Sequence, residues 1–329
     1  MKKLVGTLAA AGFLAVSATA GTINVANSDI EMEGGVSAGY FYTSNIGSSN
    51  TDYFTVSSFA VDLKAEAKPI GFTAGFGASG QPDLLDATQP PSPNFELEYG
   101  WVSIKPIEGL TLNAGLLTTN IGYELYHTYD NPNYTFGMVW YGQPFVYPGA
   151  RATYTVAEGI DVYAEYNQDS GDAFAVGSIG SIGNINYAVS YYDYAANKNL
   201  VDVVLSTNVS GIDIGVNADY QWYDDTAKTA GNDDSAYGVA LYVIPSLSKT
   251  VSIPVRIEYI NQGTSGIYAA GIGKNAKSFT ITPTWKPTEN TYLRAEFSYV
   301  STDKKGFTDD KGNNKDSRTF AGVEAGFLF

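Results

Sequence analysis

Charged residues recur at two-residue spacing in several segments of the 329-residue chain. Arg256 and Glu258 are separated by one apolar residue, and so are Arg294 and Glu296. Side chains two positions apart lie on the same face of a β-strand. These guanidinium and carboxylate groups would therefore share a polar face of a sheet. There they could stabilise the sheet by ion pairs or attract charged solutes.

His127 is the only histidine. A Ser-His-Asp arrangement requires an imidazole oriented beside a serine and an acid, yet the surrounding stretch 121–145 contains no serine. A barrel-type hydrolase is thus the disfavoured alternative. We expect no catalytic residue and no enzyme activity, and we interpret His127 as a solvated or pore-lining side chain.

Metal and cofactor sites are not indicated either. The chain has no cysteine, which excludes thiolate metal sites. The acidic stretches 232–234 and 309–316 lack the Asp-x-Asp-x-Asn-Gly spacing that wraps oxygens around calcium. We expect solvated acidic loops there, and neither a metal nor a cofactor.

The composition indicates strands and excludes nucleic acid as a partner. Charged residues make up 16% of the chain, below the roughly 25% of soluble domains. The 25 tyrosines suit strands, and the 35 glycines suit tight turns. The formal charge of −15 would repel a phosphate backbone.

The first twenty residues predict a secretory signal peptide. Two lysines follow Met1, a mostly apolar stretch covers residues 4–16, and small residues 18–20 precede Gly21. The apolar stretch is too short to be a spanning helix. We therefore expect residues 1–20 to be a signal peptide and residues 21–329 to form a single exported domain.

Apolar and polar residues alternate along most of that domain, which is typical of strands with one apolar and one polar face. Residues 212–222 show the pattern most clearly. Sixteen such segments are predicted, at 30–43, 53–67, 70–80, 95–106, 110–120, 146–157, 160–167, 172–180, 184–194, 199–208, 211–223, 235–246, 250–261, 276–286, 290–302 and 317–329. Short turns and longer polar loops alternate between them.

Two all-β architectures fit this pattern. A soluble sandwich would bury each apolar face against a second sheet, whereas a transmembrane barrel would turn the apolar faces to lipid and the polar faces to a watery lumen. The signal peptide, the absence of cysteine and the alternating connection lengths favour the barrel. We predict an antiparallel up-and-down β-barrel of about 16 strands in a bacterial outer membrane, with short periplasmic turns and long extracellular loops.

Aromatic residues support the same interpretation, because rings gather at the two interfaces of a bilayer. We expect outward-facing rings at both ends of the strands. Those near the short turns are Phe72, Trp285, Tyr292 and Phe327, and those near the long loops are Tyr40, Tyr42, Trp222, Tyr259 and Tyr299.

The alternation continues to the last residue, Phe329, with Glu324 on the opposite face. In lipid no backbone donor or acceptor can stay unpaired, so the last strand of a spanning sheet must pair with the first. We therefore expect the terminus to lie within the sheet. An aromatic final residue also resembles the signal that the barrel assembly machinery recognises in outer-membrane barrels.

Residues 110–157 carry a family resemblance. Gly122-Tyr123-Glu124, then an Asn-Pro-Asn-Tyr stretch at 131–134, then a strand beginning Pro144-Phe-Val-Tyr147, together resemble the β-barrel porin-2 (OmpL-like) family of outer-membrane proteins. Tyr147 stands where the family pattern has histidine, and Leu116 where a lysine commonly follows the glycine. The resemblance implies a porin-like channel without a defined substrate.

The inward faces predicted by the alternation are rich in acids. The inward acids are Glu31, Glu33, Asp62, Glu66, Glu96, Glu98, Asp161, Glu165, Asp202, Asp213, Asp219, Glu258, Glu296 and Glu324. The inward bases are Lys64, Arg151, Arg256, Lys286, Arg294 and Arg318. Fourteen acids against six bases leave eight carboxylates without a basic partner, so the lumen is predicted to favour cations.

The stretch 121–145 is the longest connection. We expect it to fold inward as a pore constriction that brings Glu124, His127 and Asp130 toward Arg151. An outward lid or adhesive loop is the alternative.

These features predict a passive diffusion channel for small hydrophilic solutes and ions, modestly cation-selective, because a sixteen-stranded barrel is too wide to be filled by side chains. The alternative is a surface barrel that displays its loops for adhesion or partner binding. Expected partners are outer-membrane lipid, the assembly machinery and small solutes. The permeant solute, the strand count (14, 16 or 18) and a homotrimeric state stay open.

Overall fold

The computed structural model describes residues 21–25, 28–49, 51–80, 82–85, 94–169, 171–195 and 197–329. The predicted signal peptide, residues 1–20, lies outside this part of the chain. Among the described residues, none of the helices combines the length and the apolar character needed to cross a membrane.

The described residues form strands, one short 3-10 helix and one short α-helix. The strands are β1 (Gly21–Val25), β2 (Ser28–Thr43), β3 (Asp52–Ala65), β4 (Ile70–Ser79), β5 (Glu96–Ile107), β6 (Leu110–Thr118), β7 (Val146–Ala157), β8 (Ile160–Asn167), β9 (Ala173–Ile182), β10 (Ile185–Asp193), β11 (Lys198–Val209), β12 (Ile212–Tyr223), β13 (Ser235–Pro245), β14 (Val251–Ser252), β15 (Val255–Asn261), β16 (Asn275–Ile281), β17 (Thr284–Thr288), β18 (Thr291–Thr302), β19 (Phe307–Thr308), β20 (Asn314–Lys315) and β21 (Ser317–Leu328). The helices are η1 (Thr128–Asp130) and α1 (Met138–Tyr141).

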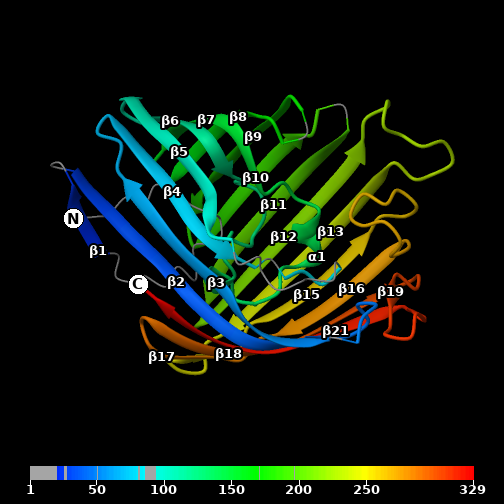
Figure 1. Cartoon of the computed structure of the whole chain (residues 1–329). Coiled ribbons are helices and arrows are strands. Elements are labelled where there is room, and N and C mark those ends of the chain that lie inside the picture. The colour runs from blue at the N-terminus through cyan, green and yellow to red at the C-terminus, as the bar shows by residue number, and fades with distance from the viewer. Residues whose placement is uncertain are drawn as a thin grey trace.

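Each long strand pairs antiparallel with the strand that follows it, and β21 returns to pair with β2. The sheet is therefore closed (Figure 1). Two of its strands are interrupted at prolines: Pro254 lies between β14 and β15, and Pro283 between β16 and β17. Proline has no N–H to donate to the ladder. With each interrupted pair counted as one strand, the barrel has sixteen, and all sixteen predicted segments are confirmed.

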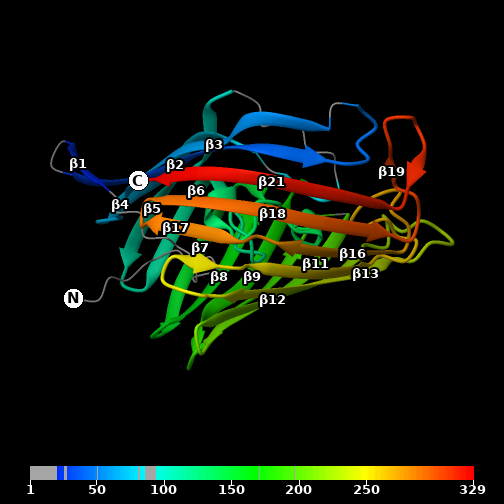
Figure 2. The ribbon, with the colours of Figure 1, turned by 90° about the horizontal axis from the view of Figure 1, so that it is seen from below.

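The C-terminus lies within the sheet, as expected. Figure 2 shows β21 between β2 and β18. The backbone N–H of Phe329 donates to the carbonyl of Gly34 at 2.9 Å, and the N–H of Gly34 donates back at 2.8 Å. Closure thus leaves no edge that would expose unpaired backbone groups to lipid.

The barrel is apolar outside and polar inside. On β18, Leu293 is 48% exposed on the outer face whereas the adjacent Arg294 is 4% exposed. One predicted outward ring is wrong, since Tyr292 is only 6% exposed. Its hydroxyl donates to Glu324 at 3.1 Å. Tyr292 precedes an outward leucine on the same strand, so alternation turns it inward.

The connections differ between the two rims. Two-residue turns join β5 to β6 and β7 to β8, and in each a glycine with left-handed φ, Gly109 at 79° and Gly159 at 73°, completes the reversal. At the opposite rim most loops are longer, and the loop 303–316 contains the small hairpin of β19 and β20. That hairpin and the β1 extension of β2 were not predicted.

Candidate pore site inside the barrel

The segment 121–145, which joins β6 to β7, lies inside the barrel (Figure 1). Its backbone N–H groups donate to carboxylates of distant strands. Gly122 donates to Asp202 of β11 at 3.2 Å, and Val139 donates to Glu258 of β15 at 3.1 Å. Because its helices are one turn or less, the segment gains little from its own hydrogen bonds and depends on these wall contacts.

Asn131 closes the first half of the segment into a compact turn. Its side-chain amide donates to the carbonyls of Leu125 at 2.8 Å and His127 at 3.2 Å, and its side-chain oxygen accepts from the N–H of Leu125 at 2.7 Å. One buried amide therefore satisfies three backbone groups that no helix or strand serves.

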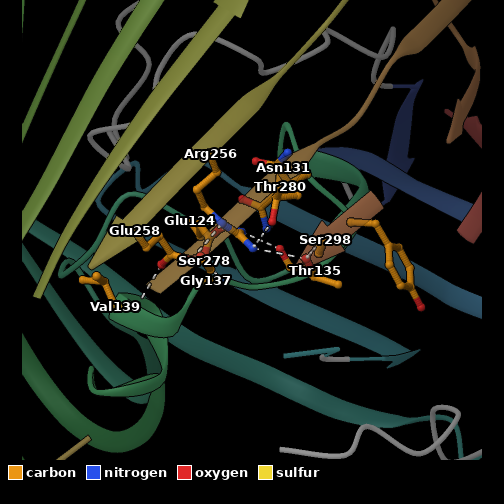
Figure 3. A network of polar contacts seen from close by, with 12 residues as sticks. Glu124, Asn131, Thr135, Gly137, Val139, Arg256, Glu258, Ser278, Thr280 and Ser298 are labelled. Carbon is orange, nitrogen blue, oxygen red and sulfur yellow. Dashed lines mark hydrogen bonds and ion pairs between the residues drawn. The ribbon is translucent and has the colours of Figure 1, made fainter. Parts of the chain in front are cut away.

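Arg256 of β15 is the centre of the main polar network (Figure 3). One terminal nitrogen of its guanidinium donates to Glu124 and to the carbonyl of Thr135, the latter at 2.5 Å. Its Nε lies 3.2 Å from Glu258. The second oxygen of Glu124 accepts from the N–H of Gly137 at 2.7 Å. A single guanidinium thus joins two carboxylates and the backbone of the segment.

Burial raises the pKa of Glu124 to about 7, because the loss of hydration and the nearby Glu258 outweigh the attraction of Arg256. One positive charge cannot neutralise two buried carboxylates, so one of them gains a proton easily.

Arg294 and Glu296 of β18 hold the middle of the segment. Arg294 donates to Glu324 at 2.6 Å and to the carbonyls of Asn131 and Thr128, both at 3.1 Å. Glu296 accepts from the N–H of Thr135 at 2.9 Å. The inward residues of this strand therefore bind both donors and acceptors of the segment's backbone.

His127 contacts another part of the wall, formed by β3, β4 and β5. Its Nδ1 lies 3.1 Å from the hydroxyl of Ser79, and its Nε2 lies 3.3 Å from the hydroxyl of Tyr99 and 3.5 Å from Asp62. The ring is 2% exposed and stacks on Tyr129 with the ring centres 5.0 Å apart.

Burial opposes the charged form of this ring, but the acids Asp62, Asp130 and Glu98 together outweigh it and raise the pKa of His127 above 6.5. Burial also raises the pKa of Asp130, from 3.8 to about 6. These groups lie close enough for their protonation states to depend on one another.

The stretch 121–145 contains no serine, but the fold brings Ser79 and Asp62 to His127 from other strands. A serine, a histidine and an acid therefore do meet. The hydroxyl of Ser79 also lies 3.2 Å from that of Ser58, and the rings of Tyr126 and Tyr129 pack against the imidazole. The imidazole itself is nearly inaccessible, unlike that of a serine hydrolase, which must reach the bound substrate.

The expected meeting of Glu124 with Arg151 is wrong. Arg151 donates to Glu165 at 2.6 Å, to Asn120 at 3.0 Å and to the carbonyl of Thr118 at 2.6 Å. Alternation predicts that a residue faces inward but not which wall a crossing segment will reach.

The other predicted lumen residues divide by depth. Seven are buried on the inner face: Glu165, Asp219, Arg256, Glu258, Arg294, Glu296 and Glu324. Glu98 accepts from the N–H of Ser79 at 3.0 Å. Asp161 and Asp213 lie close to short turns, where they accept from Thr155 at 2.7 Å and from Asn208 at 2.6 Å. Glu96 is exposed at the start of β5.

Sequence reasoning missed the neutral amides. The side-chain amide of Gln143 lies at hydrogen-bonding distance from Asp202, Asn217 and Asp219, and so ties the end of the segment to β11 and β12. Counting charges cannot identify such a residue. A signal was available, since Asp202 and Asp219 are inward acids with no predicted basic partner.

Comparison with known proteins agrees with this architecture. No curated protein matches the chain significantly. Among solved structures, OmpT of Vibrio cholerae has a TM-score of 0.68 at 12% identity, covering 94% of this chain and 100% of its own. The outer membrane channel DcaP of Acinetobacter baumannii has a TM-score of 0.66 at 11% identity, covering 93% and 99%. An anion-selective porin from Comamonas acidovorans has a TM-score of 0.61 at 10% identity, covering 92% and 100%. At these identities the likeness is one of fold alone.

The family comparison is more specific than the structural one. The sequence pattern of the family described as "Putative beta-barrel porin-2, OmpL-like" matches residues 29–329. This range contains all sixteen barrel strands except the first residue of β2. The chain belongs to this family of outer-membrane porins.

Proposed function

We propose that the protein is a diffusion channel for small hydrophilic solutes and ions, narrowed by the segment 121–145. The observation that carries the proposal is the anchoring of this segment on opposite walls, by Gly122 to Asp202 of β11 and by His127 beside Asp62 of β3. A segment fixed at both sides crosses the lumen. Solutes must therefore pass beside it, which limits their size.

The channel is proposed to be modestly cation-selective. The guanidinium groups of Arg151, Arg256 and Arg294 are each within an ion pair, so they offer little free positive charge to an anion. The excess of inward acids attracts cations. Selectivity is modest because salt screens the wall charges within a Debye length of about 8 Å at physiological ionic strength.

The anion-selective porin from Comamonas acidovorans has the same fold. The fold is thus compatible with anion selectivity, so the cation preference proposed for this chain rests on the side chains of its lumen.

Conductance and reversal-potential measurements in planar lipid bilayers test this proposal. At neutral pH and low salt, a KCl gradient should give stepwise conductance and a reversal potential of cation sign. Replacing Glu124→Gln together with Asp130→Asn should reduce that potential. The control pair, Asp225→Asn with Asp310→Asn, removes two carboxylates from exposed loop positions and should change the reversal potential less.

Anion preference would contradict the lumen assignment. If a barrel shown to be folded by heat-shifted gel mobility gives no conductance, the alternative of a surface barrel that displays its loops would be favoured.

We also propose that the outer face contacts outer-membrane lipid and that Phe329 is the assembly signal. The backbone bonds between Phe329 and Gly34 do not require an aromatic side chain. Phe329→Ala should therefore lower the amount of barrel inserted in the membrane of cells, while protein refolded in detergent keeps its heat-shifted mobility. Phe327→Ala, which removes a lipid-facing ring from the same strand, should insert normally. Equal insertion of both variants would refute the proposal that Phe329 is the assembly signal.

A further inference from the structure

A recess lies inside the barrel near the short-turn rim. It opens toward the lumen, and its lining includes Tyr129, Asp130, Ser252, Lys286, Tyr292 and Arg294. One side of it is the inward segment and the other is the barrel wall at β14, β17 and β18. Asp130 and Lys286 are both half-buried, so a solute in the lumen can reach their side chains at the mouth of the recess.

Two opposite charges face this recess without a direct partner. In the described part of the chain, no hydrogen bond and no ion pair within 4.0 Å reaches the ammonium of Lys286 or the carboxylate of Asp130. The two groups still attract each other electrostatically. They are therefore close enough to interact, yet too far apart to neutralise each other by contact.

Arg294 shows the contrast within the same lining. Its guanidinium donates to Glu324 and to two backbone carbonyls of the segment. Each of its three nitrogens already donates to the wall or to the segment, and its charge is paired with Glu324. Lys286 is the basic group of the recess that is left available.

Tyr129 closes one side of the recess. Its side chain is 8% exposed and lines the recess, but its hydroxyl is sealed from solvent. The charged groups that the recess offers to a solute are therefore one ammonium and one carboxylate.

We propose that this recess binds small zwitterionic solutes of the amino-acid class, with the solute carboxylate at Lys286 and its ammonium at Asp130. An anion would meet repulsion from Asp130, and a cation would meet repulsion from Lys286. A zwitterion satisfies both charges at once. This inference rests on the proposed channel function and names a solute class for it.

The test is proteoliposome swelling with four solutes of equal size and different charge. L-alanine is zwitterionic, lactamide is neutral, lactate is anionic and alaninamide is cationic. The wild type should admit alanine faster than lactamide by roughly twofold to tenfold, the gain expected from weak, solvated charge contacts.

Lys286→Gln and Asp130→Asn should each reduce the preference for alanine. Lys286→Gln should also slow lactate and speed alaninamide, whereas Asp130→Asn should do the reverse. Lys249→Gln is the matched control, because it removes a lysine from an exposed turn outside the recess and should change none of these ratios. Heat-shifted mobility verifies that each variant is folded.

The outcomes separate this inference from the channel proposal. Equal entry of alanine and lactamide overturns the zwitterion site while the channel stands. Faster alanine entry in Asp130→Asn overturns it in favour of an anion site. If none of the four solutes enters, the channel proposal itself fails, and the zwitterion site fails with it.

Discussion

The inward segment is anchored on two walls by different chemistry. At β15, Glu124 is bonded to a guanidinium that stays protonated at every working pH. At β3 and β5, His127 lies 3.5 Å from Asp62 and 3.9 Å from Glu98, and it attracts these acids only while the ring carries a proton. The anchorage at Arg256 has a permanent positive charge, and the anchorage at His127 has a positive charge only when the imidazole is protonated.

This difference shows that a segment inside a barrel can be held in place by one contact while the strength of another contact depends on protonation. The Arg256 anchorage also receives the backbone of the segment, through Thr135, so it positions the chain. The His127 anchorage contacts the wall through side chains alone. We expect the first to decide whether the segment stays inside, and the second to modulate how firmly it is held.

The largest expected effect comes from Arg256→Met. Removing one partner of a buried ion pair costs about 3–5 kcal/mol, because the other charge stays buried without compensation. Glu124 and Glu258 would both lose their guanidinium, so the segment should leave the lumen. Single-channel conductance in planar bilayers should rise, and protease should cleave within 121–145.

Arg151→Met is the matched control for this prediction. Arg151 is equally buried and ion-paired, but its carboxylate partner, Glu165, belongs to the neighbouring strand β8. Its removal should weaken the barrel by a similar free energy of unfolding and leave the conductance nearly unchanged. If both variants raise the conductance equally, the special role of the Arg256 anchorage is refuted.

The barrel was predictable because one rule governs every strand. Lipid outside and water inside impose a two-residue rhythm, and it located even the interrupted strands around Pro254 and Pro283. The rhythm failed only where it was applied inconsistently, at Tyr292.

The destination of 121–145 was not predictable from the same rule. Glu124 and Arg256 are 132 residues apart, and alternation carries no information about position around the barrel. The choice of wall depends on shape and on neutral groups such as Asn131 and Gln143, which a count of charges ignores.

The smallest expected effect is a dependence of conductance on pH, with two limbs. A raised carboxyl pKa means that the inward position favours protonated Glu124, so the segment is held less firmly as the pH rises from 4.5 to about 7. A raised histidine pKa means that the inward position favours charged His127. Its contribution is complete below 6.5 and is lost as the pH rises through the raised value. Conductance should therefore increase with pH over both ranges.

Each of the two pH ranges is tested by its own variant. Glu124→Gln should flatten the dependence between 4.5 and 7 while the change above 6.5 persists, and His127→Gln should do the opposite. Asp130, whose pKa is raised to about 6, should leave a residual slope of the same sign in both variants. Conductance measured at fixed molar KCl, where wall charges are screened, separates this movement from ion selectivity. A conductance that falls with rising pH would reverse the sign of both arguments and exclude a segment held by these two anchorages.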